Sequence, residues 1–372
     1  MKKLLSLALA AVLLATAFAM AGCGSSNNTA SGNNGTDAAA KPKIGISMPT
    51  KSLQRWNQDG SNMEAAFKQA GYTVDLQYAG DNDVPTQVNQ IQNMISGNCK
   101  VLVIAAIDGS SLTDVLKGAK DANITVIAYD RLIMNSDAVD YYATFDNTKV
   151  GTLQGAFIEE KLGLKTNKGP FNIELFTGDP ADNNVNFFFG GAMDVLKPYI
   201  DSGVLKVPSG QVTQAQAATP DWSTENSQKR MENLISAQKY GPNGTKLDAV
   251  LSSNDSVANG ITNALVAAGY TKDNFPILTG QDCDKTSVQN MLKGLQSMSV
   301  FKDTRKLADR VVKMVNDIVN GKTPEINAPD IYDNGQGKKI PTYQEDPQVV
   351  TKDDIQSVLI DSGYYKAADV GL

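Results

Sequence analysis

The sequence contains no histidine, and this absence removes several kinds of site at once. Without imidazole there is no histidine general base, no Ser-His or Cys-His nucleophile pair and no histidine-ligated zinc. Carboxylates and lysines could still catalyse, so the composition disfavours an enzyme without excluding one. After the first residues there is also no long run of Lys and Arg, and the formal net charge is −6, so nucleic acid is a poor partner.

Cysteine is scarce, and none of the three cysteines lies at a spacing typical of a metal motif. Cys99 and Cys283 are therefore predicted to be free thiols in separate halves of the fold. Two Asp- and Asn-rich segments, 81–83 and 179–184, resemble calcium loops only superficially, because the central Gly and the Glu at the twelfth position are missing. The sequence predicts no metal and no cofactor.

The amino terminus has the features of an export signal. Lys2 and Lys3 precede the apolar stretch Leu4–Met20, and small residues lead to Cys23. This ending resembles a bacterial lipoprotein signal, with Met20 where Leu is usual. The resemblance implies that residues 1–22 are removed and that Cys23 carries the lipid. An ordinary cleaved signal with an incidental cysteine is the alternative.

The segment after this signal has the composition of a linker. Residues 23–42 are rich in Gly, Ser and Asn and have no large apolar residue, so they are predicted to be a flexible tether. No later segment is long and apolar enough to cross a bilayer. We therefore expect an exported protein, held by a lipid at the outer face of the cytoplasmic membrane, whose folded body has about two domains.

From residue 43 on, Val- and Ile-rich runs alternate with amphipathic segments, several of which are closed by glycine. This alternation predicts an α/β fold of two lobes, each with parallel strands and crossover helices. The expected strands are Ile44–Met48, Thr73–Tyr78, Val101–Ile107, Ile124–Tyr129, Tyr141–Phe145, Phe171–Phe176, Leu205–Val207, Ala249–Leu251, Ile277–Leu278, Met298–Phe301 and Gln348–Val350. The expected helices are Gln58–Ala70, Val84–Ser96, Leu112–Ala122, Val150–Leu162, Phe187–Ile200, Ser223–Gln238, Ser256–Ala268, Ser287–Gly294 and Arg305–Asn320, with a short helix in the tail.

Polar side chains follow the carboxyl ends of many predicted strands. Ligands of open parallel α/β sheets bind in the crevice outside these ends, so we expect the polar residues to gather there. Carboxylates accept hydrogen bonds, guanidinium and ammonium groups donate them, and amides do both. Together with an aromatic ring, such groups suit a small polyhydroxylated molecule.

Several motifs, taken in order, resemble the type I periplasmic sugar-binding proteins of ABC importers, most of all the ChvE-type multiple-sugar receptors and the D-xylose-binding proteins. They are Arg55-Trp56, Tyr129-Asp130-Arg131, Phe145-Asp146-Asn147, Asp182-Asn183-Asn184, Asn254-Asp255, Gly280-Gln281-Asp282 and Phe301-Lys302. The resemblance implies two Rossmann-like lobes that close on one sugar about a hinge of three chain crossings. It places the first lobe at 43–146 plus 303–330 and the second at 147–302 plus 331–372.

The resemblance also implies roles for single residues. Trp56 and Trp222, the only tryptophans, would cover the two faces of a pyranose. The residues implied to contact the sugar through polar groups are Arg55, Asp130, Arg131, Asn147, Asn184, Asn254, Asp282 and Lys302, with Lys51, Asp108 and Asp255 in a second rank. Structural roles compete with these: a salt bridge for Lys302 and core packing for the tryptophans. For the run Phe187-Phe188-Phe189 core packing is the expected role, with one ring facing the ligand as the alternative. Helix capping competes for Asn254 and better suits Asp255.

These features predict a non-enzymatic, monomeric binding protein that delivers a monosaccharide to an ABC permease and its ATPase. The resemblance suggests an aldopentose or aldohexose such as xylose, galactose, glucose or arabinose. A sugar sensor for a chemoreceptor or sensor kinase would have the same sequence features. A glycoside-processing enzyme would need Asp130 and Asp282 as its carboxylate pair. A regulator of the LacI type would need a helix-turn-helix where this chain has its export signal.

Overall fold

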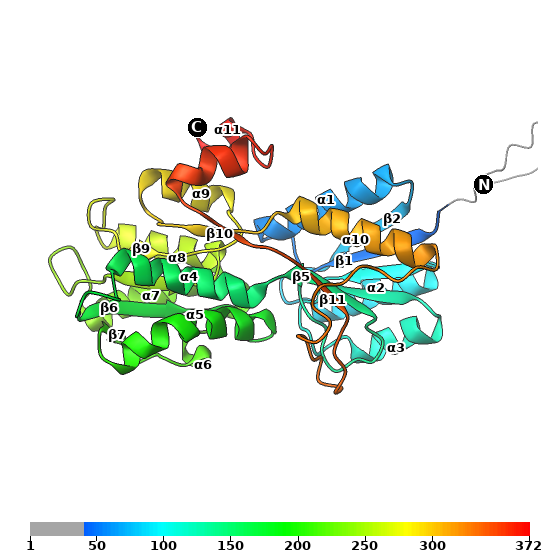
Figure 1. Ribbon diagram of the computed structural model, residues 1–372, viewed down its shortest axis with the longest axis horizontal. Coiled ribbons are helices and arrows are strands. Elements are labelled where there is room, and N and C mark those ends of the chain that lie inside the picture. The colour runs from blue at the N-terminus through cyan, green and yellow to red at the C-terminus, as the bar shows by residue number, and fades with distance from the viewer. Residues whose placement is uncertain (1–40) are drawn as a thin grey trace, which may run out of the picture. The chain divides into compact units, whose positions relative to one another are not determined.

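The computed structural model describes residues 41–372, which form two lobes, each built around a parallel sheet (Figure 1). The six-stranded first sheet has the order β11-β5-β4-β3-β1-β2, and the four-stranded second sheet has the order β7-β6-β8-β9. An antiparallel pair, β10-β12, belongs to the second lobe. The predicted α/β fold is confirmed. The predicted signal peptide, Cys23 and most of the predicted tether lie outside the described residues.

The elements divide between the lobes as follows. The first lobe contains β1 (Lys43–Met48), α1 (Gln54–Gln69), β2 (Thr73–Tyr78), α2 (Val84–Ser96), β3 (Val101–Ile104), α3 (Thr113–Asp121), β4 (Thr125–Tyr129), β5 (Tyr141–Phe145), α10 (Thr304–Val319) and β11 (Thr342–Glu345). The second lobe contains α4 (Asn147–Leu162), β6 (Phe171–Phe176), α5 (Asn184–Asp201), β7 (Leu205–Lys206), α6 (Gln214–Ala217), η1 (Pro220–Trp222), α7 (Thr224–Gln238), β8 (Ala249–Ser252), α8 (Asp255–Ala267), β9 (Ile277–Leu278), α9 (Lys285–Lys293), β10 (Ser299–Phe301), β12 (Gln348–Val350), η2 (Lys352–Asp354), η3 (Ile355–Ile360) and α11 (Ala367–Val370).

The first sheet is buried on both faces because successive side chains of a strand point to opposite sides. Val101 and Val103 of β3 pack in the cluster that contains the apolar face of α10. Leu102 and Ile104 pack in the other cluster, with residues of α2 and α3. This double burial explains why the strands are near-continuous apolar runs, and it leaves the strand ends as the polar part of the sheet.

The third chain crossing lies later in the sequence than predicted. β11 pairs in parallel with β5, and Tyr332 and Ile340 are buried in the first-lobe core. Residues 331–345 therefore belong to the first lobe, and the prediction of a crossing near residues 330–333 is wrong. The segment 342–345 reads Thr-Tyr-Gln-Glu, which lacks the Val/Ile run of the other strands, so no apolar pattern marks this edge strand.

The carboxyl-terminal tail packs on the second lobe around α9, where Ile355, Leu359 and Tyr365 share a core with Cys283. Cys283 and Cys99 are both buried and free, and they lie in different lobes, as predicted.

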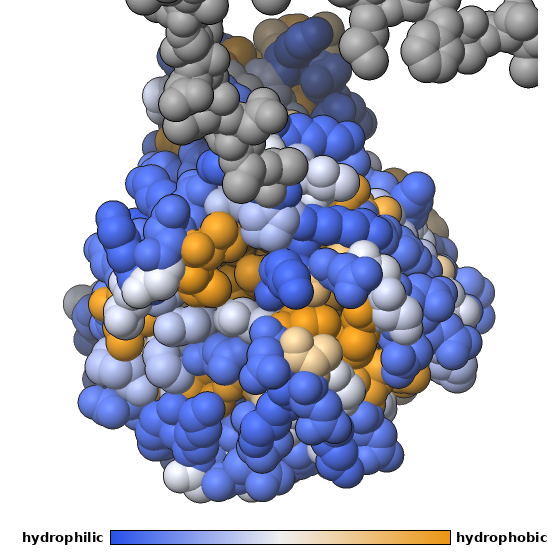
Figure 2. Space-filling model, turned by 90° about the vertical axis from the view of Figure 1, so that its right-hand side faces the viewer, coloured by the Kyte–Doolittle hydropathy of each residue, from blue (hydrophilic) through white to orange (hydrophobic). Residues whose placement is uncertain are grey.

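Within residues 41–372, no helix has the length and apolar character needed to cross a membrane. The outer end of the first lobe is mostly hydrophilic, with smaller hydrophobic patches between the polar groups (Figure 2).

Candidate functional site

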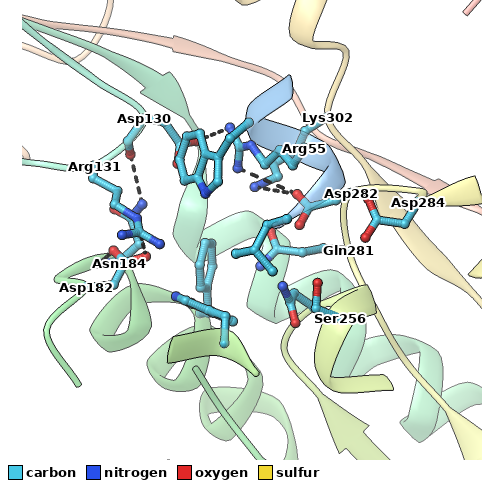
Figure 3. A pocket seen from close by; sticks show the side chains of 15 residues that line it. Arg55, Asp130, Arg131, Asp182, Asn184, Ser256, Gln281, Asp282, Asp284 and Lys302 are labelled. Carbon is cyan, nitrogen blue, oxygen red and sulfur yellow. Dashed lines mark hydrogen bonds and ion pairs between the residues drawn. The ribbon is translucent and has the colours of Figure 1, made fainter. Parts of the chain in front are cut away.

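A cavity with about 400 Å³ of empty space lies between the two lobes, and Figure 3 shows charged side chains converging on it from both sides. The first lobe contributes Leu53, Arg55, Trp56, Asp130 and Arg131. The second lobe contributes Asp182, Asn184, Phe188, Trp222, Asn254, Ser256, Gln281, Asp282 and Asp284, and Lys302 lies at the crossing. The structure thus brings together every first-rank predicted contact except Asn147.

Arg55 and Trp56 lie in the first turn of α1, which begins four residues earlier than predicted. Two guanidinium groups lie near the Trp56 ring: the Cζ of Arg55 is 4.9 Å and the Cζ of Arg131 is 5.1 Å from the ring centroid. Cations at this distance from an indole are attracted to its ring. The two arginines therefore hold Trp56 in place on the cavity wall.

Arg55 is surrounded by three carboxylates. Its Nε donates to Asp59 at 2.9 Å, its Nη2 donates to Asp130, and its Nη1 is 3.6 Å from Asp282. Burial lowers the pKa of Arg55, but the three carboxylates outweigh burial and hold this pKa well above its ordinary value. Burial likewise raises the pKa of Asp130, but Arg55, followed by Lys302, brings the net value below the ordinary one. Asp130 is therefore an ionised hydrogen-bond acceptor. The Arg55 guanidinium lies near both Asp130 and Asp282, the two carboxylates that a glycoside-processing enzyme would need as its pair.

The backbone of Asp130 is fixed by a link between the lobes. Its φ of 57° is left-handed, and its carbonyl accepts hydrogen bonds from Tyr142 Oη at 2.6 Å and from Asn184 Nδ2 at 2.8 Å. Trp222 and Asp282 also have positive φ, at 53° and 95°. Such conformations cost about 1–3 kcal/mol each in a non-glycine residue and cluster at functional sites. Three predicted sugar contacts are therefore held in strained positions.

Trp222 reaches the cavity from the 3₁₀ turn Pro220–Trp222 of the second lobe. Gly178 lies against the ring so closely that a Cβ there would be 2.1 Å from Trp222 Cη2. Phe188 meets the indole edge to face, with the ring centroids 6.2 Å apart. Among the described residues, the buried Trp222 Nε1 has no hydrogen-bond partner. The two tryptophans line one cavity from opposite lobes rather than two separate interiors.

The aromatic run 187–189 is divided among three environments, because each residue of a helix is turned by about 100° from the one before. Phe187 packs on Tyr332 of the first lobe, with centroids 5.0 Å apart. Phe188 lines the cavity, and Phe189 is buried in the second-lobe core. Core packing, the role favoured from the sequence, describes Phe189, and it describes Phe188 in part, because that ring is buried in a second-lobe core cluster as well as lining the cavity.

The crossing side of the cavity is rich in charge. Lys302 is 2% exposed, and its Nζ is 2.9 Å from Asp282 Oδ1, so the predicted competing salt bridge exists beside the cavity. Burial, together with the negative charge of Asp282, raises the pKa of Asp284 to about 7. Among the described residues, Asp284 Oδ1 and Gln281 Oε1 have no hydrogen-bond partner. Buried polar atoms are rarely left unpaired, so these atoms are suited to a polar ligand.

Asn254 takes the capping role that was expected for Asp255. Asn254 is the residue that caps α8, since its Oδ1 accepts from Val257 N at 2.9 Å, and it still lines the cavity. Asp255 is fully buried behind the wall and accepts from Asp284 N at 2.8 Å and from Ser299 Oγ. Asp255 does not line the cavity, and its predicted capping role is wrong.

Three further predicted contacts are not brought to the cavity. Asn147 is fully buried, and its Nδ2 donates to Asn184 Oδ1 at 3.0 Å, so it supports a lining residue from behind. Lys51 is exposed, with its Nζ 4.9 Å from the Tyr78 ring. Asp108 accepts hydrogen bonds from the two serines that follow it.

Sequence reasoning missed six lining residues as contacts. Asp182 is ion-paired with Arg131 Nε at 3.0 Å, and both Asp182 and Gln281 stand inside motifs that the sequence had singled out. Ser256 and Asp284 lie within two residues of such motifs. Phe188 had been assigned to the core, and no sequence pattern marks Leu53.

The residues described by the structure include no group of three or more metal-ligating side chains arranged to hold an ion. The cavity instead combines two indoles with acceptors, donors and amides, and this set can bind a polyhydroxylated molecule through both its faces and its hydroxyl groups.

Comparison with known proteins identifies the family. A family model for the periplasmic binding protein domain matches residues 44–323. The multiple sugar-binding periplasmic protein SbpA of Azospirillum brasilense is 52% identical over 341 residues, which cover 91% of this chain and 94% of SbpA. The multiple sugar-binding periplasmic receptor ChvE of Rhizobium radiobacter is 52% identical over 332 residues, or 89% of this chain and 92% of ChvE.

A solved structure agrees with these relatives. The solute binding protein of an ABC transporter from Clostridium phytofermentans, crystallised with β-D-glucose, has a TM-score of 0.85 and 60% identity, and the match covers 88% of this chain and 99% of that one. The chain therefore belongs to the periplasmic binding protein family. The resemblance to type I sugar-binding proteins of ABC importers is confirmed, and so is the prediction of a binding protein rather than an enzyme, because the relatives are sugar-binding receptors.

Proposed function

We propose that this protein captures one aldopentose or aldohexose in the cavity between its lobes and delivers it to an ABC permease. The observation that carries the proposal is the cavity itself, with Trp56 and Trp222 on walls from opposite lobes and paired charges between them. An indole on each face suits a pyranose, whose faces are made of C–H bonds.

The polar lining suits hydroxyl groups, which donate and accept at the same time. The ionised Asp130 would accept, while Arg55, Arg131 and Lys302 would donate, and each bond to a charged group contributes roughly 1.5–3 kcal/mol. Because Arg55 is paired with Asp130 and Lys302 with Asp282, the sugar meets groups that are held in position. Asn184 and Asn254 supply amides, which can both donate and accept hydrogen bonds.

The relatives support a sugar as the ligand and suggest which sugar to test first. SbpA and ChvE are described as multiple sugar-binding proteins, and the Clostridium phytofermentans protein contains bound β-D-glucose. D-Glucose is therefore the first ligand to try, followed by D-xylose, D-galactose and L-arabinose.

Capture would proceed by closure of the lobes about their three crossings. Several contacts join the lobes directly, including the ion pair of Arg131 with Asp182 and the bond from Gln54 Nε2 to Tyr365 Oη at 2.8 Å. We propose that these contacts form when the lobes close on the sugar and break when it is released. The permease would then recognise the closed arrangement of the two lobes.

We further propose that the mature protein is a monomer tethered through a lipid on Cys23. The support is the sequence around Cys23, followed by a Gly-, Ser- and Asn-rich segment. A Cys23→Ser variant is expected to appear in the soluble rather than the membrane fraction of the producing cell. An unchanged distribution would contradict the anchor. Service to a chemoreceptor or sensor kinase remains the second candidate, with the same ligand and fold.

The test of sugar binding is a thermal-shift screen against pentoses and hexoses, followed by isothermal titration calorimetry, because a tight ligand of the native state raises the melting temperature. Asp130→Ala is expected to lose binding. Asp114→Ala, which removes a surface carboxylate of the first lobe, is the matched control and should bind as the wild type does. The absence of binding to every sugar, or normal binding by Asp130→Ala, would refute the proposal.

A further inference from the structure

The charges that line the cavity do not balance. Three cationic side chains and four carboxylates line the cavity, and the ion pairs join Arg55 to Asp130 and Asp282, Arg131 to Asp182, and Lys302 to Asp282 at 2.9 Å. Among the residues that the structure describes, the fourth lining carboxylate, Asp284, has no cationic partner. The cavity therefore lacks one positive charge.

Asp284 is not a solvated surface acid that could do without a partner. The residue is 8% exposed, and its Oδ1 has no hydrogen-bond partner within residues 41–372. It occupies the cap position before α9, yet its side chain makes no capping bond to that helix. Gln281, 1% exposed, also lines the cavity with an unpartnered Oε1. Two acceptors without donors thus line the second-lobe side of the cavity (Figure 3).

The environment of Asp284 disfavours its charged form. A buried carboxylate without a counter-charge is unfavourable, and it is relieved by taking up a proton. The groups that act on it are Asp255 behind the wall, Asp282 in the same loop, Arg55 from α1, Lys302 from the crossing, and Tyr365 and Cys283 from the tail side. Burial and the nearby Asp282 prevail, so the pKa of Asp284 is raised to about 7.

A neutral monosaccharide supplies donors but no charge, whereas an ammonium group supplies both. We propose that Gln281 and Asp284 form a subsite for the ammonium group of an amino sugar, and that the protein binds such a sugar in preference to its neutral parent. This inference rests on the proposed function, because it requires a sugar in this cavity. The ammonium would donate to Asp284 Oδ1 and to Gln281 Oε1 and would complete the charge pairing of the lining.

The experiment compares D-glucose with the four regioisomers that carry an amino group in place of the hydroxyl at position 2, 3, 4 or 6. Calorimetric titration of the wild-type protein is expected to show at least tenfold tighter binding for one regioisomer than for glucose. The readout is the ratio of the two dissociation constants, so a general change in affinity does not affect it. If no regioisomer binds more tightly than glucose, the inference is wrong.

A second measurement needs no variant. Because the pKa of Asp284 is raised to about 7, this carboxyl would hold a proton at pH 6 before the sugar binds, and the arriving ammonium would displace that proton to the buffer. Titrations in two buffers of different ionisation enthalpy should therefore show close to one proton more released by the preferred amino sugar than by glucose. Equal proton release by the two ligands would overturn the proposal.

Substitution then assigns the effect to the residue. Asp284→Asn should reduce the amino-sugar to glucose ratio to about one, while Asp273→Asn, which removes an exposed carboxylate of the same lobe, should preserve it. A preference that survives Asp284→Asn would contradict the subsite. If no sugar binds, neutral or amino, the proposed function fails as well, and this outcome is distinct from glucose binding without a preference.

Discussion

Replacing Gly178 with alanine tests the position of Trp222 without touching any polar contact. The new Cβ would be 2.1 Å from Trp222 Cη2 and Cζ2, whereas ordinary contacts begin near 3.4 Å. The indole would have to move by about 1.3 Å, because it is a rigid ring that cannot bend away. The backbone of Gly178 does not require glycine, since its φ is not positive. The effect would therefore be purely steric.

The expected magnitude follows from overpacking, which costs typically about 1–3 kcal/mol in a packed site. We expect the free energy of unfolding to fall by this amount. We also expect the dissociation constant for the sugar to rise about tenfold or more, since about 1.4 kcal/mol of lost binding energy is a factor of ten. Urea unfolding measures the first quantity, and calorimetric titration measures the second.

Gly190→Ala is the matched control. Gly190 lies inside α5, and a Cβ there would meet no atom within 4 Å. Alanine favours a helix over glycine by about 0.8–1.0 kcal/mol, so this variant should be slightly more stable and should bind sugar normally. If Gly178→Ala binds sugar as tightly as the wild type, the placement of Trp222 on the cavity wall is wrong.

Three further predictions concern affinity, pH and thiols. Trp222→Ala should abolish measurable sugar binding while far-ultraviolet circular dichroism stays native, and retained affinity would contradict the role of this ring. Burial raises the pKa of Asp255 and of Asp284 in the folded state, so the folded protein binds more protons than the unfolded chain. The free energy of unfolding should therefore fall as the pH rises from about 4 to about 7, and a flat denaturation profile over this range would refute the shift. Cys99 and Cys283 should react with a thiol reagent only after denaturation, and rapid labelling of the native protein would disagree with their burial.

The strands and helices could be predicted from the sequence where burial creates a pattern. The helix Val84–Ser96 and the strands Thr73–Tyr78 and Phe171–Phe176 have the predicted bounds, because apolar periodicity marks each of them. The first turns of α1 and α5 were missed, since Arg55, Trp56 and Asn184 there line the cavity and do not continue the apolar period of their helices. The start of a helix is therefore predicted least accurately from hydrophobic periodicity where that helix begins at a binding site.

The candidate site was predictable as a set of residues and not as a geometry. Strand-end motifs identified Asp130, Asn254 and Asp282, because parallel strands bring their carboxyl ends to one edge. Adjacent residues of a motif could not be ranked in this way. Only the structure shows that Asn254 lines the cavity while Asp255 is buried behind it.

What the sequence determined by itself was local: the alternation of strand and helix, the lack of histidine chemistry, and the polar character of the strand ends. The tertiary structure alone decided which lobe takes residues 331–345, since strand pairing depends on contacts between segments far apart in the chain. It also decided which charges are paired. Arg55 meets Asp130 from 75 positions away, and within residues 41–372 Asp284 has no cationic partner, because ion pairing depends on distances in space that spacing along the chain does not specify.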